Sequence, residues 1–197
     1  MKRRNGQTGK RRYATAALLS ALLLAVALAV PLITSSATDR PQEEPYVPFV
    51  ATPEPVVEEM LEIAKVNAQD IVYDLGSGDG RIVIAAARLF GARGVGIEID
   101  PDLVREATMY AEQVGVANLV RFVEGDLFAA DLHEATVVTL FLLPEANRQL
   151  LPKLLAELRP GTRILSYKYS LGDWAPEKTV HVSHGTVYYW VVPVRQR

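Results

Sequence analysis

The chain has 197 residues, a formal net charge of −2 and no cysteine, which excludes disulfide bonds and thiolate metal sites. Residues 1–40 hold seven basic residues and one acid, so residues 41–197 carry a net charge of −8. An acidic domain repels phosphate backbones, and we therefore expect no nucleic acid among its partners.

The first 40 residues differ in composition from the rest of the chain. A basic head, residues 2–12, precedes an uncharged apolar stretch, residues 14–33. Twenty helical residues reach roughly 30 Å, the thickness of a bilayer's hydrocarbon core. We expect residues 1–40 to be a single-pass membrane anchor, with residues 14–33 as the span. A cleaved export signal is the alternative, because Ser35-Ser36-Ala37 resembles a cleavage site.

Residues 41–51 are rich in proline and polar groups and are interpreted as a linker, which ends in "PYVPF". Residues 52–197 are expected to form the folded domain. Thr52 is predicted to cap its first helix and Pro53 to open it, with apolar residues recurring on one helical face from Val56 to Ala64.

Strands and helices then alternate. We predict strands at 71–75, 93–99, 120–126, 135–143 and 162–169, and helices at 81–90, 101–114 and 145–159. The last helix is expected to be interrupted near Pro152. Two further strands joined at His184-Gly185 follow residue 178 with no helix between them. This order predicts an α/β fold with a mostly parallel sheet and a C-terminal antiparallel hairpin.

A glycine-rich loop, "DLGSGDG" at residues 74–80, lies where the first strand of this series meets a helix. Ligands bind at the carboxyl ends of strands in open α/β sheets. The spacing differs from the G-x-G-x-x-G of dinucleotide sites, and Asp74 and Asp79 would repel a pyrophosphate. Two carboxylates suit a ligand with a cationic part, such as S-adenosylmethionine (SAM).

The loop resembles motif I of class I SAM-dependent methyltransferases, and the order of elements resembles their Rossmann-like seven-stranded fold. The resemblance implies that SAM is the cofactor and that each of three successive strands ends in a contact to it. The implied cofactor-binding residues are Asp74, Gly76, Ser77, Gly78 and Gly80 in the loop, Glu98 at the ribose, Asp126 at the adenine amino group, and Ile99 and Leu127 beside the adenine ring.

A narrower resemblance covers most of residues 45–176. "PYVPF", "DLGSGDGRIVIAAA", "GVGIEID", "FLLP" and "SYKYSLGDWAP" resemble the family of the ATP synthase c-subunit lysine N-methyltransferase and its bacterial relatives. This resemblance implies methylation of a protein lysine, with a membrane protein as the partner. "FLLPE" also lacks the Asn/Asp-Pro-Pro-aromatic motif of base-methylating enzymes.

A lysine acceptor must lose a proton before it can accept a methyl group, and an apolar pocket lowers its pKa. We expect Phe141 and Trp174 to line that pocket, because aromatic faces accommodate methylammonium groups. Tyr46, in "PYVPF", is the candidate catalytic residue. The three histidines lack the spacing of metal ligands, and we predict no metal.

Two different functions also fit the same motifs. In the first, the acceptor is a membrane-soluble small molecule, a quinone or a lipid. In the second, the chain binds SAM without catalysis, because no catalytic base is evident. The six basic residues ahead of the apolar stretch predict the domain outside the cell, whereas SAM is made in the cytosol, so the side of the membrane stays open.

Overall fold

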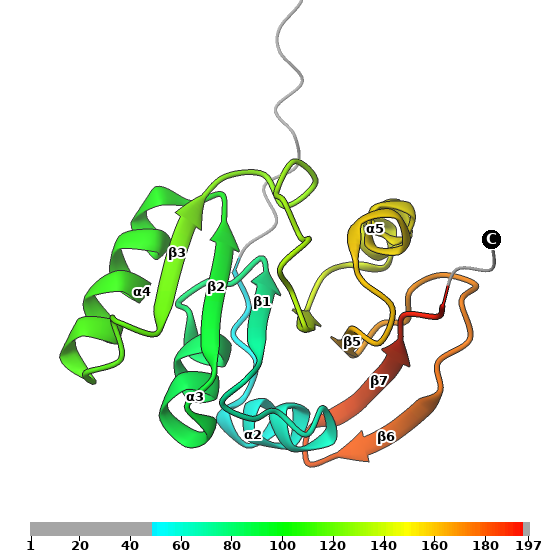
Figure 1. Ribbon diagram of the computed structural model, residues 1–197, viewed down its shortest axis with the longest axis horizontal. Coiled ribbons are helices and arrows are strands. Elements are labelled where there is room, and N and C mark those ends of the chain that lie inside the picture. The colour runs from blue at the N-terminus through cyan, green and yellow to red at the C-terminus, as the bar shows by residue number, and fades with distance from the viewer. Residues whose placement is uncertain (1–48, 195–197) are drawn as a thin grey trace, which may run out of the picture. The chain divides into compact units, whose positions relative to one another are not determined.

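The computed structural model describes residues 49–194, in which seven strands form one mixed sheet (Figure 1). The strands are β1 (Ile71–Leu75), β2 (Arg93–Glu98), β3 (Val120–Glu124), β4 (Val137–Leu140), β5 (Arg163–Tyr167), β6 (Lys178–Val182) and β7 (Gly185–Val191). Their spatial order is β3-β2-β1-β4-β5-β7-β6. The first five strands in this order are mutually parallel, and β7 is antiparallel to both of its neighbours. The predicted fold class is confirmed.

Helices cover both faces of the sheet. They are α2 (Glu54–Ile63), α3 (Arg81–Phe90), α4 (Pro101–Gln113) and α5 (Pro144–Glu157). Buried residues of α2, α3 and α4 pack with one core cluster, and those of α5 pack with the other. Successive strand residues alternate between the two clusters, as in β1, where Val72 belongs to the first and Tyr73 to the second. Asp74 therefore lies on the α2/α3 face.

Three local expectations differ from the structure. Pro53, not Thr52, is the N-cap of α2, and the Thr52 carbonyl instead accepts a hydrogen bond from Arg81 Nη1 at 2.8 Å. Helix α5 runs through Pro152 without a break, since packing of Leu150 and Leu154 in the core outweighs the lost backbone bond. Strand β4 ends at Leu140 rather than at residue 143, because Pro144 opens α5.

The predicted membrane location is corrected here. Within residues 49–194, no helix combines the length and the apolar character that crossing a bilayer requires. The predicted span, residues 14–33, lies outside the described residues.

Candidate functional site

The glycine loop follows β1 at the carboxyl edge of the sheet. Gly76, Gly78 and Gly80 have φ values of 79°, 53° and 77°, in the left-handed region that side chains disfavour. The N–H groups of Gly76 and Ser77 both donate to the Ile97 carbonyl, at 2.9 and 3.0 Å, which ties the loop to the end of β2. The backbone conformation accounts for the three glycines.

Side chains from other segments press closely on the same loop. A Cβ atom at Gly78 would lie 2.0 Å from the ring of Phe49, and one at Gly80 would lie 2.4 Å from the ring of Phe122. A Cβ at Gly76 would lie 3.0 Å from Leu142 Cδ2. The loop is thus also a packing surface, and Phe49, from the "PYVPF" segment, lies directly on it.

Asp74 is a buried carboxylate beneath the loop. Its Oδ1 accepts a hydrogen bond from Thr139 Oγ1 at 2.7 Å, across the β1–β4 pair. Desolvation raises the pKa of Asp74 to about 7; the Thr139 bond opposes this shift, and the charges of Asp79 and Glu98 add to it. Among the described residues, no protein donor reaches its Oδ2. A cationic ligand group would stabilise the charged form.

Glu98, the last residue of β2, is half-buried and already holds three backbone donors. Its Oε2 accepts from the Gly78 N–H at 2.8 Å, and its Oε1 accepts from Ile99 N at 2.8 Å and from Asp100 N at 3.0 Å. A carboxylate offers about four lone-pair positions. One position is therefore left for a ligand hydroxyl while the Gly78 bond is in place.

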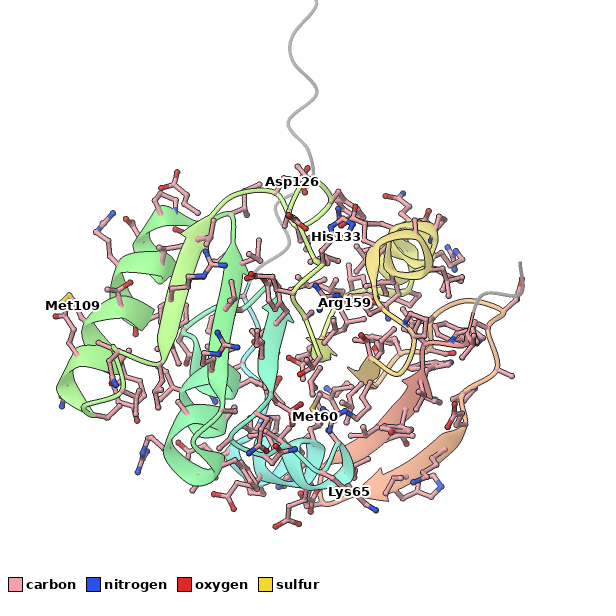
Figure 2. The ribbon with its side chains drawn as sticks, viewed as in Figure 1. Met60, Lys65, Met109, Asp126, His133 and Arg159 are labelled. Carbon is pink, nitrogen blue, oxygen red and sulfur yellow. The ribbon has the colours of Figure 1, made fainter. Side chains whose placement is uncertain are left out.

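The third strand end carries Asp126, which is labelled at the upper edge of the molecule in Figure 2. Its Oδ1 accepts from Phe128 N at 2.8 Å, within a turn. The Gly125 N–H donates to the Glu98 carbonyl at 2.9 Å, so the ends of β2 and β3 are joined. Ile99 is 71% exposed, whereas Leu127 packs against the second core cluster. The structure brings the three predicted strand ends to one edge.

Two neighbouring polar groups differ in their partners. Asp79 forms an ion pair with Arg81, in which Nε lies 2.9 Å from Oδ1, so its charge is largely paired within the protein. The Ser77 hydroxyl is buried and has no hydrogen-bond partner among the described residues. An unpartnered buried hydroxyl beside Asp74 and Glu98 fits a site that receives polar ligand groups.

The predicted acceptor residues lie in different places. Phe141 follows β4 and packs edge to face on Tyr167, with ring centroids 4.8 Å apart, on the α2/α3 face. Trp174 packs with the opposite cluster, 5.9 Å from Trp190, whose Nε1 donates to the Trp174 carbonyl. Tyr46 lies outside the described residues. The residue after Phe141, Leu142, is the one that contacts the glycine loop, at Gly76.

Two residues that the sequence interpretation missed support the site. Thr139 holds Asp74, and Arg81 joins the loop to Thr52. Thr139 carried a usable signal, because it is the one polar residue in the otherwise apolar β4. A polar side chain in a buried strand requires a partner, and the neighbouring strand provides an aspartate. Arg81 carried no such signal.

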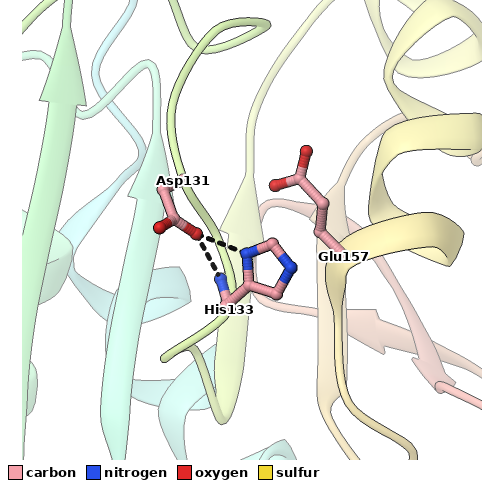
Figure 3. Close-up of side chains that lie close together, drawn as sticks. All are labelled: Asp131, His133 and Glu157. Atoms are coloured by element: carbon pink, nitrogen blue, oxygen red, sulfur yellow. Dashed lines mark hydrogen bonds and ion pairs between the residues drawn. The ribbon is translucent and has the colours of Figure 1, made fainter.

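Three side chains that could hold a metal lie together elsewhere, as Figure 3 shows for Asp131, His133 and Glu157. His133 Nδ1 lies 2.6 Å from Asp131 Oδ1. Glu157 accepts from Lys153 Nζ at 2.6 Å and from Leu132 N at 3.2 Å. Each carboxylate already has a protein partner, and we assign this cluster no metal. The prediction of a metal-free protein stays a prediction.

Comparisons with known proteins agree with this geometry. Residues 74–178 match the model of the ANTKMT methyltransferase domain. A protein-lysine N-methyltransferase from Saccharolobus islandicus is 49% identical over 75% of this chain and 95% of its own length. An ATP synthase c-subunit lysine N-methyltransferase from Xenopus laevis is 37% identical over 68% of this chain, which spans only 57% of that protein.

A solved structure is also similar. It is described as an RNA methyltransferase from Salinibacter ruber in complex with S-adenosyl-L-homocysteine, with a TM-score of 0.73 and 57% identity. It covers 75% of this chain and 97% of its own. The predicted resemblance to SAM-dependent methyltransferases is confirmed by these matches. The chain therefore belongs to the ANTKMT methyltransferase family.

Proposed function

We propose that this protein transfers the methyl group of SAM to a lysine side chain of a protein. The observation that carries the proposal is the 49% identity to a protein-lysine N-methyltransferase that the chain spans almost completely. The site supports the donor half of the reaction, because the glycine loop, a buried carboxylate and Glu98 converge at one edge of the sheet.

The cofactor-binding residues are part of this proposal. Asp74 Oδ2 is directed to a cationic group of SAM, and Glu98 Oε2 to a ribose hydroxyl. Ser77 Oγ supplies a further polar partner. The backbone of Gly76, Gly78 and Gly80 lets the ligand approach closely, Asp126 binds the adenine amino group, and Ile99 and Leu127 flank the adenine ring. The free Oδ2 and the unpartnered Ser77 hydroxyl, both judged among the described residues, support these roles.

When bound, SAM supplies a methyl carbon attached to a positively charged sulfur. The protein's task is then alignment, together with exclusion of water from the acceptor. We propose that Phe141 borders the acceptor amine, since it lies one residue beyond β4 and its chain neighbour Leu142 contacts Gly76. Trp174 is proposed to hold the neighbouring loop. Tyr46 is proposed as the catalytic hydroxyl; its support is that Phe49, three positions later, packs on Gly78.

The protein that carries the methylated lysine is indicated by the name of a relative. We propose a lysine on a membrane-associated protein, because the name of one relative gives the c-subunit of ATP synthase as its target. The match spans 57% of that relative. The acceptor protein is therefore best identified directly.

RNA is the second candidate acceptor, because a structure 57% identical to this chain is described as an RNA methyltransferase. The charge of −8 over residues 41–197 opposes it, since an acidic surface repels a phosphate backbone. Transfer to a quinone or a lipid is a third hypothesis, and SAM binding without catalysis is a fourth.

Transfer of labelled methyl groups distinguishes these functions. The full chain is incubated with SAM labelled in its methyl group and with a total extract of cells that lack the gene. We expect the label in protease-sensitive material and, by mass spectrometry, on lysine Nζ atoms. Label removed by ribonuclease would support RNA, and label in a lipid extract would support a small-molecule acceptor. SAM binding with no transfer would support a binding module. The Glu98→Ala variant serves as the matched control.

A further inference from the structure

Lys168 presents its ammonium group to the two aromatic rings beside the proposed acceptor site. Its Nζ lies 5.2 Å from the centroid of the Phe141 ring and 5.3 Å from that of Tyr167. Its backbone is held in the left-handed region, with φ at 66°, and its N–H donates to the Thr186 carbonyl at 2.8 Å. A lysine rarely adopts this backbone conformation.

The charge of this lysine is not neutralised by a neighbour. Within residues 49–194, no carboxylate forms an ion pair with Lys168. Lys168 is exposed, and its ammonium lies over two aromatic rings. It therefore adds a positive charge without an ion-pair partner at this point.

The register of the sheet brings this charge close to the donor loop. Gly76, Phe141 and Tyr167 each come one residue after the laterally aligned positions Leu75, Leu140 and Ser166. Neighbouring strands lie about 4.8 Å apart, so Gly76 and Tyr167 are separated by about 10 Å across the sheet. In the proposed reaction the acceptor amine is aligned with a methyl group above the glycine loop and is bordered by Phe141. Such an amine would lie between Gly76 and Tyr167.

We propose that Lys168 selects the neutral form of the acceptor amine, because its ammonium repels a second ammonium at the Phe141 ring. This inference rests on the proposed transfer to lysine. Lys168 acts through its field on the acceptor and takes no proton itself. A unit charge at ~8 Å, partly screened by solvent, lowers the pKa of a neighbouring amine by about one pH unit.

The step that depends on this selection begins with loss of the acceptor's proton to water. The lone pair of the acceptor nitrogen then forms the N–C bond to the methyl carbon, while the C–S bond breaks and its electron pair remains on sulfur. The methylated nitrogen loses its additional proton to water before any further transfer. A protonated acceptor amine has no lone pair. Below the pKa of that amine, the fraction of it that is neutral therefore sets the rate of transfer.

Other titratable groups face the same region from neighbouring elements. They are Asp74 from β1, Asp79 from the glycine loop, Glu59 from α2, Tyr167 from β5 and His181 from β6. Burial raises the pKa of Asp74 to about 7, so this group contributes its own step to a rate profile. Substitution of Lys168 leaves all five groups in place. A shift in the part of the pH–rate curve that reports deprotonation of the acceptor amine is therefore attributable to Lys168.

The test compares Lys168→Gln, Lys168→Arg and the parent chain. Lys65→Gln is the matched control: Lys65, which is labelled in Figure 2, also has a positive φ, at 52°. Its carbonyl accepts from Arg163 Nη1 at the start of β5, whereas Lys168 follows the end of β5. Single-turnover methylation of poly-L-lysine at saturating SAM is measured over the neutral to alkaline pH range. Thermal unfolding and calorimetry with SAM identify a variant that has lost its fold or its donor site.

We expect the rising limb of the single-turnover rate to move up by about one pH unit in Lys168→Gln. Lys168→Arg and Lys65→Gln are expected to keep the parent's limb, because both retain the charge at position 168. The inference would be overturned if the rate of Lys168→Gln rose at the same pH as that of the parent, or if Lys168→Arg showed the shift expected for Lys168→Gln. Neither result would contradict lysine methylation. Failure of the parent to methylate any lysine at any pH would overturn the proposed function and this inference with it.

Discussion

The backbone N–H of Gly78 donates to Oε2 of Glu98 at 2.8 Å, and this bond joins two strand ends that are 20 residues apart in the chain. The bond shapes the glycine loop and at the same time orients the carboxylate that is proposed to bind the ribose. Three of the roughly four lone-pair positions of Glu98 are thereby used by the protein. A single side chain thus supports the loop and the proposed ligand contact.

Replacing Glu98 should weaken SAM binding. Glu98→Ala removes a charge-assisted hydrogen bond to the ligand and leaves three N–H groups without their acceptor. At about 1.5–3 kcal/mol for such a bond, we expect the Kd for SAM to rise by about 10- to 100-fold, measured by calorimetry. Glu124→Ala is the matched control, because Glu124 aligns with Glu98 in the next strand and is exposed. Equal losses in the two variants would contradict the assigned role.

A methyl group at Gly78 should cost more than one at an open glycine. Gly78→Ala places a Cβ 2.0 Å from the Phe49 ring, in addition to the strain of a positive φ. We expect the free energy of unfolding to fall by about 2–4 kcal/mol. Gly115→Ala shares the positive φ, at 76°, but meets no atom within 4 Å, and should lose only about 1 kcal/mol. Urea denaturation of both variants measures the difference, and similar losses would argue against the Phe49 contact.

The stability of the ligand-free protein should fall as the pH rises from about 4 to about 7. Burial raises the folded pKa of Asp74 to about 7 from its ordinary value of 3.8, so its stabilising contribution is complete below about pH 4 and is lost above pH 7. The loss is on the order of 4 kcal/mol as an upper bound. Asp74→Asn should remove this dependence and be more stable than the parent at mildly alkaline pH.

Asp74→Asn should stabilise the ligand-free protein at mildly alkaline pH but weaken its binding of SAM. Asp74→Asn removes a negative charge that faces a cationic cofactor, so SAM should bind it more weakly than the parent at mildly alkaline pH. Denaturation at one pH near 4 and one above 7, with and without SAM, measures both effects. A parent chain that is equally stable at the two pH values would show that Asp74 does not titrate in this range.

Asn147 should hold the loop that carries Lys168. It is fully buried in α5, and its Nδ2 lies 3.2 Å from each of three acceptors, Ser166 Oγ and the carbonyls of Tyr169 and Ser170. Asn147→Ala should lower the free energy of unfolding by about 2–3 kcal/mol. Asn147→Asp should lower it further at neutral pH, because a carboxylate would face two carbonyls.

Hydrogen exchange provides the local measurement for this residue. Amides of residues 168–174 should exchange faster in Asn147→Ala, whereas β1 and β2 should stay protected. Asn118→Ala, at an exposed asparagine, is the control and should match the parent within about 0.5 kcal/mol. Uniformly faster exchange over the whole sheet would mean that Asn147 contributes only to global stability.

Many residues of the site could be predicted from short sequence patterns. The hydrogen-bond partners of those residues could not. Gly76, Gly78 and Gly80 identified a loop between a strand and a helix, and the structure has this loop after β1 with all three glycines at positive φ. The partners of Asp74 and Glu98 depend on strand register: Thr139 is 65 residues from Asp74, and no local period relates them. Phe141 and Trp174 were expected in one pocket because aromatic faces accommodate methylammonium groups, yet they pack with different core clusters.

The sequence by itself determined the order of strands and helices, the parallel sheet with its antiparallel end, and the family, because periodicity, turn residues and motif spacing are properties of neighbouring positions. Only the tertiary structure decided that the Glu98 carboxylate serves the glycine loop, that Asp79 is paired with Arg81, and that Lys168 lies over Phe141. These relationships follow from how strands align and side chains compete for space and hydrogen bonds. That competition involves residues far apart in the chain, so short stretches of sequence do not encode its outcome.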